Sequence, residues 1–128
     1  MRKYLAIFIA AIFVFGSVFA QPQVDDVSNS LNKGEVSNVV KYFDKIVDIT
    51  INNDQSTYSK SQAEMVVKSF FSKNQARSFF VRHKGVASSD NSVFVIGELK
   101  TANGPYRVYI FFKQRDKNYW LQQIKFEQ

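Results

Sequence analysis

The sequence predicts an α+β domain in which helices collect on one face of an antiparallel sheet, in the order α-α-β-β-α-β-β-β-β. Three observations indicate this class. Apolar residues recur at helical spacing before residue 44 and again over 63–71, and they alternate with polar residues over 45–51 and in four runs after residue 76. Clusters of Asn, Asp, Ser and Gly separate those runs. Such short connections join antiparallel neighbours, because a parallel crossover needs a dozen residues or more.

Two short helices and a strand are expected first. Val24, Val27 and Leu31 lie at helical spacing, and this helix should end near Gly34. A second short helix is indicated by apolar residues at i, i+3, i+4 and i+7, which are Val36, Val39, Val40 and Phe43. Residues 45–51 then alternate as a strand does, with one apolar face made of Val47, Ile49 and Ile51.

The longest helix has the clearest signal in the chain. It follows a turn over 52–54 and a polar segment, 55–58, that we expect to fold back as a hairpin arm. Ser59 and Gln62 fit a capping box, with Ser61 and Glu64 as an overlapping second choice. One broad apolar stripe should face a sheet, and it consists of Ala63, Val66, Val67, Phe70 and Phe71.

The remainder of the chain predicts a four-strand meander. Turn residues occur at 88–91, 103–104 and 116–118, and Asn103-Gly104 is the strongest hairpin signal among them. The expected strands are 77–87, 92–102, 105–115 and 119–127. Trp120 and Phe126 in the last strand are expected in the core, because large aromatic side chains dominate small cores.

The chain opens like a secretory signal peptide. Two cations, Arg2 and Lys3, precede an unbroken apolar run from Leu5 to Phe15. Two small residues, Val18 and Ala20, stand before the expected cleavage point. A membrane anchor is the alternative, but the apolar run is shorter than the ~20 residues that span a bilayer. We therefore expect residues 1–20 to be removed. Residues 21–128 would then form one periplasmic or secreted domain without membrane contact.

Composition excludes several classes of protein. Hydrophobic residues make up 45% of the 128 residues, which is more than a disordered chain carries. The absence of cysteine excludes disulfides, thiolate zinc sites and cysteine nucleophiles. A transition-metal site usually needs two His or Cys ligands, and the chain has one histidine. Phosphate-binding glycine loops, dinucleotide fingerprints and Gly-x-Ser-x-Gly elbows are missing as well. We expect no metal and no cofactor.

Charge argues against a nucleic-acid partner. Without the first twenty residues the chain has 15 cations against 11 carboxylates, a net charge of +4. Cations interleaved with aromatic rings can bind single strands. The small excess of charge and the expected export both disfavour that function.

The order of elements, together with particular residues, resembles the nuclear transport factor 2-like (NTF2-like) superfamily. Closer similarity is to a family of small secreted bacterial proteins, domain of unknown function 4783 (DUF4783). The residues that carry it are 33–34, 42–43, 48–51, 58–64, 70–71, 83–85, 96–97, 106–110 and 124–127. The resemblance implies a strongly curved sheet that wraps the helices into a cone with a pocket at its open end. Because the family is uncharacterised, it implies no activity.

His83 is the best candidate for a site inside that cone. By period-two counting it shares a face with Phe79 and Val81, while Arg82 and Lys84 point oppositely, so an inward imidazole is predicted. Other members of the superfamily build isomerase or dehydratase sites from one Asp or His in an apolar pocket, which would make His83 a general base. The alternative is a histidine that only hydrogen-bonds a neighbour at the end of the sheet.

The third meander strand has aromatic residues on both faces. One face carries Tyr106, Val108, Ile110 and Phe112, and the other carries Arg107, Tyr109, Phe111, Lys113 and Arg115. If the first face packs under the helices, the second presents a ladder of cations and rings for an acidic or aromatic ligand. The alternative is a solvated face whose Arg and Lys stems cover exposed rings. The expected ligand-binding residues are His83, Arg107 and Tyr109, and no residue is assigned as catalytic.

Three functions remain open from the sequence. The leading hypothesis is a non-enzymatic module that binds an unknown small molecule or protein through the cone pocket or the open face of the sheet. The second is a pocket enzyme with His83 as the general base. The third is a structural protein that forms a homodimer through its sheet, with the exposed aromatic residues buried between protomers.

Overall fold

The computed structural model describes residues 21–87 and 91–128. Within these ranges the chain forms three helices and six strands: α1 (Pro22–Lys33), α2 (Val36–Val40), β1 (Phe43–Ile51), β2 (Asp54–Ser59), α3 (Lys60–Lys73), β3 (Ala76–Ala87), β4 (Ser92–Thr101), β5 (Gly104–Arg115) and β6 (Asn118–Glu127). The expected signal peptide and its cleavage point lie outside the described residues, as does most of the expected turn at 88–91.

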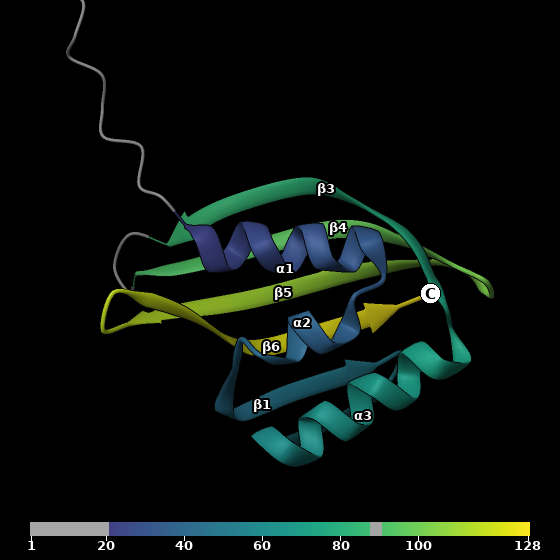
Figure 1. Cartoon of the computed structure of the whole chain (residues 1–128), viewed down its shortest axis with the longest axis horizontal. Coiled ribbons are helices and arrows are strands. Elements are labelled where there is room, and N and C mark those ends of the chain that lie inside the picture. The colour runs from purple at the N-terminus through teal and green to yellow at the C-terminus, as the bar shows by residue number, and fades with distance from the viewer. Residues whose placement is uncertain (1–20, 88–90) are drawn as a thin grey trace, which may run out of the picture.

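The six strands form one sheet in the order β2-β1-β6-β5-β4-β3. The part of this order from β1 to β3 can be followed in Figure 1. The meander from β3 to β6 is antiparallel throughout, as predicted. β1 and β6 pair in parallel, with Ile49 beside Ile124 and Ile51 beside Phe126. The rest of the chain separates these two strands, so no short connection forces them to be antiparallel. The sheet is therefore mixed at this one junction.

The helices cover a single face of the sheet, which we call the inner face. α1 packs on β3, and α3 packs on β1 (Figure 1). The predicted stripe of α3 is buried at Ala63, Val67, Phe70 and Phe71. The ring of Phe70 stacks on Phe126 at a centroid distance of 4.2 Å and meets Tyr106 edge-on at 5.1 Å. Aromatic side chains thus fill the space between α3 and the sheet.

The helix ends follow local sequence signals. Ser59 accepts a hydrogen bond from the backbone N–H of Gln62, whose side chain accepts one from the N–H of Ser59, so the predicted capping box is present. α1 ends at Gly34, whose φ of 71° is left-handed and costs a glycine little. α2 is shorter than predicted. Phe43 begins β1 instead of closing α2, and its buried side chain joins the core from the strand.

Candidate functional site

The face of the sheet opposite the helices carries the expected ladder of cations and rings. Along β5 the side chains of Tyr106, Val108, Ile110 and Phe112 are buried, while those of the alternate positions are half-buried or exposed. Those alternate positions are Arg107, Tyr109, Phe111, Lys113 and Arg115. We call this side of the sheet the outer face. Its neighbours on β4 and β6 include Phe94, Ile96, Glu98, Trp120, Lys125 and Glu127.

A row of rings crosses the outer face. Phe94 on β4 stacks with Tyr109 on β5, with centroids 6.4 Å apart and planes 19° apart. On its other side the Phe94 ring lies 6.2 Å from the imidazole of His83. The ring can reach across β3 because residue 85 is glycine, where a Cβ would lie 2.3 Å from Cε1 of Phe94. The sequence-predicted residues His83 and Tyr109 therefore belong to one aromatic row.

The predicted inward orientation of His83 is wrong, and a β-bulge is the reason. Val81 pairs with Gly97 and His83 pairs with Ile96, which leaves Arg82 as an extra residue in β3. After one extra residue, each following side chain of the strand lies on the face opposite to the one that period-two counting gives. Phe79 is accordingly buried, whereas His83 is exposed. Lys84 turns to the helix side, where its ammonium lies 3.1 Å from Asp25 on α1.

The exposure of His83 removes the pocket-enzyme hypothesis. That hypothesis needed an imidazole enclosed in an apolar cavity, where desolvation could adjust its pKa.

Within residues 21–87 and 91–128, no group of three or more His, Cys, Asp or Glu side chains is placed to hold a metal ion. Over the same residues, no helix has both the length and the apolar character needed to cross a membrane.

Opposite charges alternate across the strands beside the aromatic row. Arg107 on β5 lies between Glu98 on β4 and Glu127 on β6. Both carboxylates already have partners, because Arg82 lies 3.0 Å from Glu98 and Lys125 lies 3.6 Å from Glu127. The lining of a hollow of about 370 Å³ in the outer face includes Arg82, Glu98, Arg107 and Glu127. Neither Arg107 nor Lys113 takes part in an ion pair among the residues that the structure describes.

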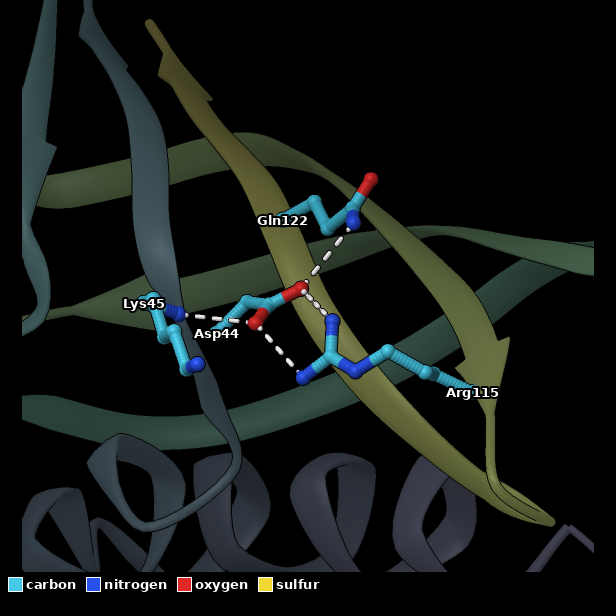
Figure 2. Close-up of polar contacts among 4 residues, drawn as sticks. All are labelled: Asp44, Lys45, Arg115 and Gln122. Atoms are coloured by element: carbon cyan, nitrogen blue, oxygen red, sulfur yellow. Dashed lines mark hydrogen bonds and ion pairs between the residues drawn. The ribbon is translucent and has the colours of Figure 1, made fainter.

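Arg115, the last cation of the ladder, is held by an acid that sequence reasoning missed. Its guanidinium donates two hydrogen bonds of 2.9 Å to the two carboxylate oxygens of Asp44 (Figure 2). The side-chain amide of Gln122 donates a third at 3.0 Å, and the backbone N–H of Lys45 a fourth at 2.8 Å. We call this group the Asp44 clamp. The Arg115 guanidinium beside Asp44, more than any other group, lowers the pKa of that carboxyl to about 2.

The clamp lies where two strand pairings lose their register. The register of β1 and β6 shifts between Phe43 and Asp48. The register of β5 and β6 shifts between Phe111 and Phe112, which makes Gln122 an extra residue in β6.

The extra residue in β6 also explains the orientation of Trp120. Phe126 is in the core as predicted, but Trp120 is on the outer face, with the Arg115 guanidinium 5.6 Å from its ring. No local pattern marks Asp44, because the side chains that bind it, Arg115 and Gln122, are more than 70 residues away.

Helices packed on the inner face of a curved, mixed sheet place the chain in the NTF2-like class of folds. An NTF2-like protein of unknown function from Shewanella oneidensis has a TM-score of 0.62 at 10% sequence identity. The match covers 83% of this chain and 93% of that one. A de novo designed protein with a curved β-sheet has a TM-score of 0.67 at 7% identity, covering 82% of this chain and 95% of that one. At such identities the likeness concerns the fold alone.

The family itself is shown by the sequence. The model of the family described as domain of unknown function (DUF4783) matches residues 24–127, and the chain belongs to this family. Solved members from Bacteroides ovatus, Bacteroides fragilis and Bacteroides uniformis are 30%, 31% and 36% identical, with TM-scores of 0.76, 0.74 and 0.76. The matches cover 80%, 80% and 81% of this chain and 92%, 95% and 94% of those chains. No curated protein matches the sequence.

Proposed function

We propose that this chain is a non-enzymatic interaction module that acts after export and binds an acidic segment of a partner protein on its outer face. One observation carries the proposal. On β5 two cations without ion-pair partners among the described residues, Arg107 and Lys113, flank two half-buried rings, Tyr109 and Phe111. Rings between unpaired cations suit a ligand with carboxylates and apolar side chains, through charge-assisted hydrogen bonds and stacking.

The distribution of charge selects β5 as the centre of the binding surface. Arg82, Lys125 and Arg115 are each neutralised by a carboxylate of the same face, so they offer little attraction to a ligand. Arg107 and Lys113 keep their charge available. Protein interfaces are enriched in aromatic residues and arginine at their centres and are polar at their rims. The aromatic row, with His83 at one end and Tyr109 at the other, supplies such a centre.

Trp120 provides a direct test, because it is the single tryptophan of the chain and lies on the outer face. The probe is a flexible peptide in which Glu alternates with Tyr, and its counterpart has Lys in place of Glu. We expect the Glu peptide to change the Trp120 emission saturably and the Lys peptide to leave it unchanged. In the double variant Arg107→Glu, Lys113→Glu, affinity should fall at least about tenfold.

The matched control is the double variant Lys33→Glu, Lys68→Glu, which has the same net charge but changes exposed lysines of α1 and α3. Its affinity for the Glu peptide should stay near that of the wild type at physiological salt, because charges beyond a Debye length are screened. Equal losses in both double variants would mean that only net charge attracts the peptide. That result, or no change of Trp120 emission at all, would overturn the proposal.

Self-association through the same face is the second candidate function. It is favoured by the mixed charge around Arg107, since a face with cations and carboxylates can be complementary to a second copy of itself. In that case Arg107→Glu should convert a dimer to a monomer in sedimentation experiments. A wild-type chain that sediments as a monomer at high micromolar concentration would exclude this candidate and leave the first one untouched.

A further inference from the structure

We propose that a groove along the flank of α3 binds an amphipathic monoanion, a molecule with an alkyl chain and one carboxylate head. The groove is separate from the outer face. It lies between α3, the end of β1 and the start of β5, and it has a volume of about 400 Å³, within the range of small-molecule sites. Its lining consists of Ile51, Met65, Val66, Ser69, Phe70, Lys73, Asn74 and Tyr106.

The body of the groove is apolar and is already formed in the free chain. Ile51 and Val66 are half-buried in its lining. Met65, also in the lining, is 71% exposed. This is the highest value among the large hydrophobic side chains that the structure describes as exposed. The floor is fixed, because the Phe70 ring is packed between Tyr106 and Phe126. A rigid apolar lining lowers the ordering cost of binding an alkyl chain.

The polar residues of the groove include one cation, which suits a head group with a single negative charge. The Asn74 side chain is already used, because its amide donates to the carbonyl of Phe70 and its oxygen accepts from Asn103 and Tyr106. Lys73 is the charged residue of the lining, and its ammonium belongs to no ion pair among the described residues. Among the residues that the structure describes, no carboxylate lines the groove. An unpaired cation beside apolar surface is complementary to a carboxylate on an alkyl chain.

The test uses dodecanoate as the probe and the methyl group of Met65 as the reporter. The full chain has two methionines, Met1 and Met65, so a chain labelled with ¹³C in its methionine methyls gives two signals that Met65→Leu assigns. We expect dodecanoate, below its micelle concentration, to shift the Met65 signal saturably. Dodecyltrimethylammonium should shift it far more weakly, because it places a second cation beside Lys73.

Variants on α3 separate the groove from general adsorption. Lys73→Gln should weaken dodecanoate binding at least tenfold, whereas Lys68→Gln, an exposed lysine of the same helix outside the groove, should leave it unchanged. Ser69→Trp places a large side chain in the groove from an exposed helix position and should abolish the Met65 shift. Circular dichroism spectra and melting curves verify that the variants fold.

Two outcomes overturn the inference. The first is a Met65 shift of equal size and affinity for the anionic and the cationic amphiphile. The second is dodecanoate affinity that does not respond to Lys73→Gln in a folded protein. The emission of Trp120 on the outer face should not respond to dodecanoate, so failure here is distinguishable from failure of the proposed acidic-peptide function.

Discussion

Asp44 and Arg115 meet through two hydrogen bonds of 2.9 Å although they are 71 positions apart in the chain. The carboxylate of Asp44 is 7% exposed, and Gln122 and the N–H of Lys45 supply two further donors. The pair connects the start of β1 to the end of β5 where both strands lose register with β6. A largely buried carboxylate with four donors should contribute strongly to stability.

The first prediction concerns removal of the charge at this position. Asp44→Asn keeps the shape of the side chain but loses the charge-assisted bonds to Arg115. We expect the free energy of unfolding to fall by about 2 kcal/mol, within the range for hydrogen bonds to charged groups. Urea denaturation measures the change. Asp54→Asn, at an exposed position with no ion pair among the described residues, is the control and should change stability by less than about 0.5 kcal/mol.

The second prediction is the pH dependence of that contribution. The pKa of Asp44 is about 2 in the folded chain against 3.8 for the ordinary group, so the folded state binds this proton more weakly than the unfolded state does. The stabilisation is therefore complete above about pH 5 and is lost as the pH falls through 4 towards 2; the full shift corresponds to about 2 kcal/mol. The stability gap between wild type and Asp44→Asn should shrink over that range. A gap that stays constant down to pH 2 contradicts this assignment.

Local sequence signals predicted the order of helices and strands, but they gave two side chains the wrong face of the sheet. Helical spacing, a capping box and turn residues predicted α3 and the meander, because these elements depend on neighbours in sequence. His83 and Trp120 were assigned to the wrong face, since each lies on a strand with one extra residue, Arg82 or Gln122. A bulge of this kind is set by the pairing of strands, and period-two counting cannot detect it.

Local sequence signals could not predict which strands and side chains pair when they are far apart in the sequence. The parallel contact of β1 with β6 joins strands from opposite ends of the domain, and the Asp44 clamp depends on it. Of the predicted ligand-binding residues, Arg107 and Tyr109 are on the expected face of β5 because no bulge falls between them. Their role in binding stays a prediction.

The third prediction tests the contact between Gly85 and Phe94. A methyl group at residue 85 would lie 2.3 Å from Cε1 of Phe94, so Gly85→Ala must displace the ring from its present position between β3 and Tyr109. We expect a loss of about 1–3 kcal/mol in stability, the range for overpacked sites. In a Phe94→Ala background the same change should be neutral or stabilising, because alanine restricts the unfolded chain. Urea denaturation of the four chains measures this, and equal costs in both backgrounds would refute the contact.

The fourth prediction concerns the pair of Asp26 on α1 and Tyr42, which precedes β1. The phenol of Tyr42 donates to the carboxylate of Asp26, and Asn38 donates to the same oxygen at 3.2 Å. The bond from Tyr42 is the main reason that the pKa of Asp26 is below its usual value. In Tyr42→Phe that pKa should rise towards 3.8, as followed by the carboxyl carbon signal in an NMR titration. Tyr58→Phe is the control and should leave the titration of Asp26 as it is.

The last prediction concerns the start of α3, the helix that supplies both the core stripe and the groove. The hydroxyl of Ser59 accepts from the N–H of Gln62 at 3.4 Å, and the Gln62 side chain accepts from the N–H of Ser59 at 3.2 Å. Ser59→Ala removes the first of these bonds and should cost about 1 kcal/mol. The overlapping candidate, Ser61, is already inside the helix, so Ser61→Ala should change little. If both variants lose the same stability in urea, the cap is not at Ser59, and the start of α3 depends on its packing against β1 instead.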